Sequence, residues 1–188
     1  DKLESYLLNA GNLSDSLAFE NVRPLIGQLV ETFRTHAAGR PHTLLLVTKG
    51  GVEECACLFE REPCANVAVS FSVNSPEAAE ALERGAAPVA DRFRAARKLK
   101  AMGWRVRMRI DPMVLGYSYE ATVEKVKALG PERITLGTLR AESNLDRYVG
   151  KGLFADLVAP EGKGLARYSR ETRLAIYRVA VNRLRGTA

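Results

Sequence analysis

The fold is decided at residues 67–74, where the sequence reads VAVSFSVN and runs directly into Ser75-Pro76. Apolar and polar side chains alternate over this stretch, so a strand here has one apolar face and one polar face. Ser75 is a residue type that caps helices, and Pro76 suits the first helical position. The stretch therefore predicts a strand that turns at once into a helix, as in an α/β unit.

The same alternation occurs at residues 104–111, WRVRMRID, where three arginines and an aspartate share one face. Further strand-like segments alternate with helical segments along the chain. The predicted strands are Tyr6–Ala10, Thr43–Thr48, Asn66–Val73, Trp104–Ile110 and Arg133–Leu139. The predicted helices are Glu20–Ala37, Gly51–Glu60, one that follows Ser75 and ends before Gly85, Pro88–Met102, Ser118–Leu129 and Ser169–Leu184.

This order of elements predicts a parallel sheet with right-handed crossovers. Helices must cover the apolar strand faces, so the polar faces line a space filled by water or ligand, as in an open or partial barrel. A two-layer sheet with one solvated face is the alternative. We expect one domain over residues 1–188, with the barrel elements in 1–140 and an irregular segment plus a basic helix in 141–188.

The formal net charge is +6, and the excess is local. Residues 92–109 carry eight Lys or Arg and no acid, and residues 161–188 carry seven against two acids. Such segments predict nucleic acid or another polyanion as a partner, with a solvated basic helix face as the other interpretation. No apolar run approaches the length of a membrane span and no signal peptide is recognisable, so we expect a cytoplasmic protein without membrane contact.

The three cysteines, Cys55, Cys57 and Cys64, have the spacing C-x-C-x6-C. This spacing is not that of a common zinc or iron–sulfur motif. We therefore expect buried free thiols and no metal ligands among them.

Polar side chains gather where the predicted strands end, which is where ligands bind in parallel α/β folds. Residues 11–16, GNLSDS, follow the first strand, and Lys49-Gly50-Gly51 follows the second. The two glycines would let the backbone approach a ligand closely. Lys49 could form a Schiff base with a carbonyl substrate, or pair as a point charge with a carboxylate or phosphate. The sequence therefore predicts a ligand site at this edge.

These strand ends resemble spore photoproduct lyase and its relatives among the radical S-adenosylmethionine (SAM) proteins. The resemblance lies in the order and spacing of GNLSDSLAF at 11–19, VTK at 47–49, SFSVN at 70–74, ERGAAP at 83–88 and RIDP at 109–112. It covers residues 8–140 well and 141–188 only loosely. It implies an α/β fold, the partial (β/α)6 TIM-like barrel of the radical SAM type, here missing its first strand.

The resemblance also implies an enzyme. In this family a C-x3-C-x2-C loop holds a [4Fe–4S] cluster that also binds SAM, and reductive cleavage of SAM gives a 5′-deoxyadenosyl radical that abstracts hydrogen from the substrate. The substrate of this chain is unknown; the family and the basic segments direct the expectation to nucleic acid and DNA repair. The electron donor is expected to be a flavodoxin or a ferredoxin.

The resemblance assigns roles to particular residues. Ser14, Lys49 and Ser72 match positions that contact SAM, and Asn74 shares the strand face of Ser72. An ammonium group can offset the cofactor's carboxylate, and hydroxyls can bind its polar groups. The residues expected to contact substrate are Asp15, Arg109, Arg167 and Tyr168.

Two features depart from the family's pattern. The cluster loop is absent, so we expect it upstream of Asp1 in a longer parent protein. The 188 residues alone are then expected to be inactive, with an open sheet edge for the missing N-terminal segment. Photoproduct lyases place a hydrogen-donor cysteine two residues before the serine matched by Ser14, but this chain has Asn12, so thymine-dimer repair by the usual route is not expected.

Two other functions stay open at this point. One is a non-catalytic nucleic-acid-binding module on a degenerate barrel, which the basic segments would suit. The other is an aldolase-type enzyme that forms a Schiff base on Lys49.

Overall fold

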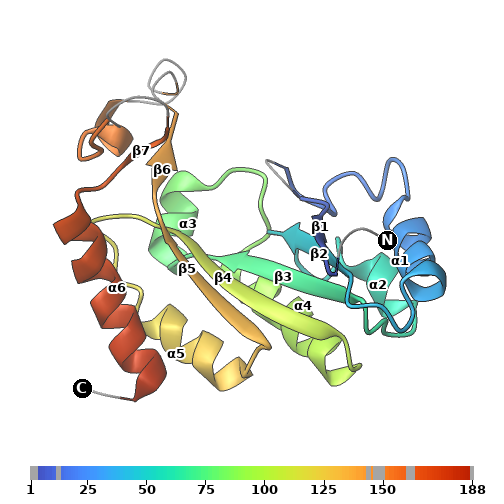
Figure 1. The fold of residues 1–188 in the computed structure, drawn as a ribbon. Helices are drawn as coiled ribbons and strands as arrows, with labels where there is room; N and C mark the ends of the chain where they lie inside the picture. Colours follow the sequence, from blue (N-terminus) through green and yellow to red (C-terminus); the bar gives the residue numbers. More distant parts are fainter. Residues whose placement is uncertain (1–3, 12–13, 143–144, 146–150, 160–163, 187–188) are drawn as a thin grey trace.

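The computed structural model describes residues 4–11, 14–142, 145, 151–159 and 164–186. Its centre is a parallel five-stranded sheet in which the strands lie side by side in chain order. They are β1 (Leu7–Asn9), β2 (Thr43–Thr48), β3 (Val67–Val73), β4 (Arg105–Met113) and β5 (Arg133–Thr138). The sheet is curled (Figure 1), which confirms the predicted α/β partial barrel.

Helices follow the strands and cover one face of the sheet. They are α1 (Ile26–His36), α2 (Ala56–Phe59), α3 (Pro76–Leu82), α4 (Val89–Ala101), α5 (Glu120–Leu129) and α6 (Arg170–Arg185). A short antiparallel pair, β6 (Arg140–Ala141) and β7 (Ala166–Arg167), stands beyond β5 near the start of α6 (Figure 1). No helix in these ranges combines the length and hydrophobicity that crossing a bilayer requires.

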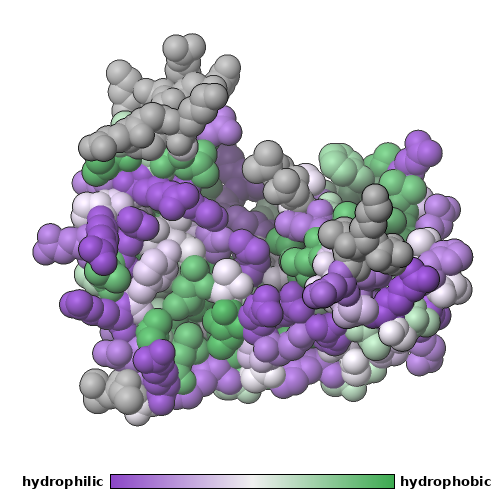
Figure 2. Space-filling view, viewed as in Figure 1, coloured by the Kyte–Doolittle hydropathy of each residue, from purple (hydrophilic) through white to green (hydrophobic). Residues whose placement is uncertain are grey.

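The two faces of the sheet differ as the alternation predicted. Val69 and Phe71 of β3 and Met108 and Ile110 of β4 are fully buried, in one core with apolar residues of α1, α4 and α5. The opposite face carries the serines of β3 and the arginines of β4, and the strand register places Ser72 beside Arg109. Figure 2 shows the surface hollowed between the β6–β7 end and the β1–α1 end, with hydrophilic side chains along the hollow.

Several helix boundaries follow the sequence, and two do not. The Oγ of Ser75 accepts from the N–H of Ala78 and caps α3, as predicted. The first helix starts at Ile26 instead of Glu20. The Glu20 carboxylate accepts from the N–H groups of Leu25 and Ile26, at 2.9 Å each, and so caps the N-terminus of the helix from the preceding loop. The segment predicted as the helix Gly51–Glu60 is mostly turns, with only the four residues of α2 helical.

The edge strand β1 is the shortest strand of the five-stranded sheet. It pairs with β2 over three residues, and the side chains of Tyr6, Leu7 and Leu8 are exposed. A parallel strand with apolar side chains is normally covered on both faces. Among the described residues no further strand pairs with the outer edge of β1.

Candidate cofactor-binding site

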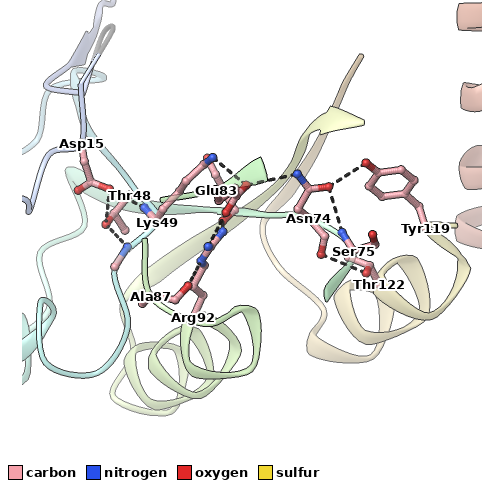
Figure 3. A network of polar contacts seen from close by, with 12 residues as sticks. Asp15, Thr48, Lys49, Asn74, Ser75, Glu83, Ala87, Arg92, Tyr119 and Thr122 are labelled. Atoms are coloured by element: carbon pink, nitrogen blue, oxygen red, sulfur yellow. Dashed lines mark hydrogen bonds and ion pairs between the residues drawn. The ribbon is translucent and has the colours of Figure 1, made fainter. Parts of the chain in front are cut away.

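Lys49 lies just after β2 at the carboxyl end of the sheet, and its ammonium group is paired with Glu83 (Figure 3). The distance from Nζ to Oε1 of Glu83 is 2.8 Å, and the side chain of Lys49 is 35% exposed while that of Glu83 is 8% exposed. Glu83 follows α3, so two distant segments of the chain form the pair. Lys49 is thereby held at the strand ends with part of its side chain open to a ligand.

The second carboxylate oxygen of Glu83 binds Arg92 of α4 at 2.5 Å. The Arg92 side chain is 1% exposed, and it also donates to the backbone oxygens of Ser72 at 3.0 Å and Ala87 at 2.7 Å. Burial alone would raise the pKa of Glu83, but the hydrogen bonds from Lys49 and Arg92 outweigh it and hold the pKa below its usual value. Glu83 is therefore an anion shared by two cations.

Asn74 connects this ion cluster to α5. Its Nδ2 donates to Glu83 at 3.3 Å, and its Oδ1 accepts from the Tyr119 hydroxyl at 2.8 Å and from the N–H of Ser75 at 3.0 Å. The Tyr119 oxygen in turn accepts from the N–H of Val114. Burial raises the pKa of Tyr119 to about 12, so the phenol stays protonated and keeps donating. The predicted cofactor residue Asn74 is thus buried and fully engaged within the protein.

Asp15 fixes the backbone at the end of β2. Its Oδ2 accepts from the N–H of Lys49 at 2.6 Å and from the hydroxyl of Thr48 at 3.1 Å, and its Oδ1 accepts from the N–H of Leu17. Both oxygens have partners, so the side chain serves to position Lys49. A direct contact between Asp15 and substrate remains a prediction.

A hollow of about 270 Å³ lies beside Lys49, lined by the charged residues Asp15, Glu54 and Arg84 and also by three alanines, Ala18, Ala86 and Ala87. Gly50 forms part of its wall and has no room for a side chain, since a Cβ there would lie 2.7 Å from the Cβ of Glu54. This turn therefore requires glycine at position 50, because the side chains of Glu54 and Thr48 occupy the space where a Cβ would lie. The hollow bordered by the Lys49 side chain stays open to a ligand.

The remaining predicted cofactor residues lie near this cluster. Ser72 is buried on the polar face of β3, and its backbone oxygen is bound by Arg92. Ser14 is exposed and lies on the same loop as Asp15. Asn12, the position of the hydrogen-donor cysteine in photoproduct lyases, lies outside the described residues. The structure thus brings Lys49, Asn74 and Asp15 into one network, with Ser72 joined to it through its backbone.

The predicted substrate residues Arg109, Arg167 and Tyr168 lie further along the sheet. Arg109 pairs with Asp111 at 2.7 Å, and Arg167 is exposed on β7. The hydroxyl of Tyr168 accepts from the N–H of Leu115, and burial raises the pKa of this phenol. Tyr168 is therefore part of the packing between α6 and the loop after β4.

Burial of the cysteines is as predicted for two of the three. Cys55 and Cys64 are buried free thiols, and Cys57 is half-buried. Burial raises the pKa of Cys57 to about 11 and raises that of Cys55 as well, which disfavours the thiolate that binds metal. Among the described residues no group of three His, Cys, Asp or Glu is arranged to hold a metal ion.

Sequence reasoning missed Glu83, Arg92 and Tyr119 as members of the site. Arg92 belongs to a basic run that reads as a solvated helix face, yet it lies on the buried side of α4. A signal was present, because Arg92 is three residues from Val89 and four from Ala96, which is the spacing of one helix face. The pairing of Glu83 with Lys49 has no local signal.

Comparison with known proteins gives a result for the fold only. No protein-family model and no curated protein matches this sequence. Two solved structures of spore photoproduct lyase match at a TM-score of 0.79 and 17% identity. One is a mutant with bound AdoMet and dinucleoside spore photoproduct, matched over 96% of this chain and 59% of that chain; the other is the enzyme complexed with dinucleoside spore photoproduct, matched over 98% and 60%. The chain therefore has the fold of spore photoproduct lyase, over about three fifths of that protein's length.

Proposed function

We propose that this chain forms the SAM-binding wall of a radical SAM enzyme of the spore photoproduct lyase type. The observation that carries the proposal is the placement of Lys49, whose ammonium group is held by a buried Glu83–Arg92 pair at the strand end beside an open hollow lined by charged residues and alanines. The fold match to a lyase structure with bound AdoMet supports the same assignment. When bound, SAM cleaved reductively at a [4Fe–4S] cluster supplies a radical that removes hydrogen from the substrate.

The residues of this site fit SAM in charge and polarity. Lys49 would offset the carboxylate of the methionyl group, and Ser14 and Ser72 would offer hydroxyl groups to its polar atoms. The described cysteines do not fit an iron–sulfur cluster, because two are buried and burial raises the pKa of Cys55 and Cys57. In the proposed enzyme the cluster is held by residues other than these three, and a flavodoxin or ferredoxin reduces it.

The protein's own groups prepare the site before any ligand binds. Glu83 orients the ammonium group of Lys49, Arg92 keeps Glu83 ionised, and Asp15 fixes the backbone N–H of Lys49. A site with its charges already placed loses little conformational entropy when a ligand enters. The carboxylate of SAM would share the Lys49 ammonium group with Glu83. The site therefore selects ligands whose anionic group can reach this ammonium group.

The substrate of the proposed enzyme is nucleic acid, and the reaction is a hydrogen abstraction connected with DNA repair. The lyase structures that match this fold contain dinucleoside spore photoproduct, and this chain carries an excess of positive charge. Asn12 cannot donate a hydrogen atom as a cysteine does, so the product radical would have to be quenched by another group.

A binding measurement with a charge-matched control tests the proposal. Lys49→Met is expected to weaken SAM binding to this chain about tenfold or more, since a charge-assisted hydrogen bond contributes about 1.5–3 kcal/mol. Lys125→Met removes the same charge from an exposed position on α5 and should change the affinity less than about twofold. Calorimetric titration with SAM gives both numbers, and equal losses in the two variants would refute the assignment.

The Schiff-base function is less well supported by the geometry. A Schiff-base lysine attacks through a free amine, whereas the Nζ of Lys49 is engaged with the Glu83 carboxylate at 2.8 Å. Borohydride trapping with simple aldehydes should therefore label Lys49 no more than the exposed Lys125.

A further inference from the structure

A second polar hollow, of about 190 Å³, lies where β4, β5, the β6–β7 pair and α6 meet. Four arginines from four different elements line it, namely Arg109, Arg140, Arg167 and Arg173. Asp111 is the only carboxylate among the described residues of this lining. Four positive charges against one negative charge leave the hollow strongly electropositive.

Asp111 positions two of these arginines. Its Oδ2 accepts from Nη2 of Arg109 at 2.7 Å and lies 3.4 Å from Nη2 of Arg140. The Asp111 side chain is only 12% exposed, so it is a fixed anchor for both guanidinium groups. Each guanidinium has five N–H donors, so both keep donors for a further acceptor.

Gly137 makes this arrangement sterically feasible. A Cβ at position 137 would lie 2.5 Å from the Cγ of Asp111, so only glycine on β5 lets the carboxylate occupy its place. The next residue, Thr138, donates its N–H to the hydroxyl of Tyr177 at 3.1 Å, which ties α6 to β5 across the same hollow. The walls are therefore fixed by backbone and buried contacts, and the arginines are presented from a rigid frame.

The outer two arginines carry the unbalanced charge. Arg173 donates through Nε to the backbone oxygen of Tyr168, and its terminal nitrogens keep free donors. The guanidinium of Arg167 has no partner among the described residues. Both also line a neighbouring hollow of about 490 Å³ at the start of α6, together with Arg170. The two hollows are therefore adjacent and share the positively charged side chains of Arg167 and Arg173.

We infer that the smaller hollow binds a phosphate group, with Arg109, Arg140 and Arg167 as direct ligands and Asp111 as the residue that positions them. Guanidinium groups match phosphate oxygens bidentately and bind them with short, charge-assisted hydrogen bonds. A water molecule occupies about 30 Å³ in the liquid, so a hollow of this size admits one phosphate group with a few waters. The adjoining basic hollow offers a place for the next group of the same ligand.

This inference rests on the proposed function only for the role of the phosphate, which would belong to the substrate acted on beside Lys49. The binding itself is independent of SAM. The phosphate has two sources that the test separates, a free phosphate or mononucleotide on one side and the phosphodiester of a nucleotide chain on the other.

The test is a titration of this chain at low salt with inorganic phosphate, with the dithymidine phosphodiester and with unlinked thymidine. The phosphodiester is expected to bind, and thymidine at the same concentrations is not. Binding of inorganic phosphate in competition with the phosphodiester would mean that the site takes an isolated phosphate group; failure of phosphate to compete while the phosphodiester binds would assign the site to nucleotide chains. If thymidine binds as well as the phosphodiester, or if neither phosphate compound binds, the inference is wrong.

Variants locate the binding. The double variant Arg140→Gln/Arg167→Gln is expected to weaken phosphodiester binding about tenfold or more. The control Arg97→Gln/Arg178→Gln removes the same charge from exposed positions elsewhere and should weaken binding less than about twofold. Equal losses in both would show general electrostatic attraction and overturn the site. SAM binding should be unchanged in the first double variant, and phosphodiester binding unchanged in Lys49→Met, so the two proposals fail separately.

A charge-neutral variant adds a second readout. Gly137→Ala keeps every charge and is expected to displace Asp111 and weaken phosphodiester binding about tenfold or more, as for one charge-assisted hydrogen bond. Thermal unfolding measures the folded fraction of the variant, and the affinity is calculated per folded molecule. Unchanged affinity in folded Gly137→Ala would mean that Asp111 does not position the arginines for phosphate.

Discussion

The two polar regions of the concave face differ in how their charges are balanced. At the ends of β2 and β3, the carboxylate of Glu83 lies between Lys49 and Arg92 with a hydrogen bond from Asn74, and three of these four side chains are buried. At the ends of β4 and β5, one carboxylate of the described residues faces four arginines, two of which are exposed and two half-buried. In the first region the charges are nearly balanced, and the network holds the Lys49 ammonium group in place. In the second region the positive charges exceed the negative ones, so the region can accept an anion.

The largest effect should come from breaking the network of the first region. Arg92→Met removes the donor to Oε2 of the Glu83 carboxylate and the arginine donors to the backbone oxygens of Ser72 and Ala87, at a cost of about 3–5 kcal/mol in unfolding free energy. Urea unfolding of the variant and the wild-type chain measures this loss of unfolding free energy. Arg97→Met, an exposed position on the same helix, should cost less than about 0.5 kcal/mol. A cost below about 1 kcal/mol for Arg92→Met would mean that the network is not a structural unit.

A smaller effect is expected in the second region. Asp111→Asn removes the one carboxylate that the described part of the chain places against the four arginines, and should lower the unfolding free energy by about 1–3 kcal/mol. Added phosphate should then stabilise this variant less than the wild-type chain, because phosphate binds the folded state and the arginines have lost the carboxylate that positions them. Thermal unfolding with and without phosphate gives the comparison, and Glu53→Gln, at an exposed position, is the control. Identical responses to phosphate in the variant and the wild type would contradict the contrast between the two regions.

The smallest effect concerns the opposite end of β4, where Glu132 balances Arg105 and Arg107. Hydrogen bonds from Arg105, with a further one from Arg107, outweigh partial burial and lower the pKa of Glu132 to about 2. Because the folded pKa is depressed, the stabilisation is complete above pH 4.5 and is lost as the pH falls from about 4.5 towards about 2.

Glu132→Gln should therefore destabilise the chain at pH 7 by less than about 1 kcal/mol, since the pair is one third exposed. The difference from wild type should shrink as the pH falls below 4.5. Urea unfolding at pH 7, 5 and 3.5 measures the difference, and one that grows towards acid would reverse the sign of this argument.

The sequence was informative wherever local spacing determines the structure. Alternation in residues 67–74 and 104–111 predicted both faces of β3 and β4. Ser75 marked the start of α3, and the predicted helix end at Leu129 is the end of α5. The first helix was placed too early because its start depends on a carboxylate that reaches forward from Glu20. Periodicity cannot detect such a contact.

The site was predicted in part for the same reason. Lys49 and Ser72 follow from strand ends, which the parallel fold brings to one edge. Glu83 lies in an irregular segment, and its meeting with Lys49 depends on how α3 packs, which no local pattern encodes. The hydroxyl of Tyr168 accepts from the N–H of Leu115, and its contact with substrate stays a prediction. A direct role for Arg109 and Arg167 depends on the phosphate titration.

The short edge strand β1 has a consequence for the kinetics of the site. Three residue pairs hold β1 to β2, so its amide hydrogens should exchange with solvent far faster than those of the central strand β3. The loop that follows β1 carries Asp15, which clamps the backbone of Lys49. Each local opening of the edge would release that clamp, whereas a strand added along β1 would slow the opening and tighten the grip on any ligand of Lys49.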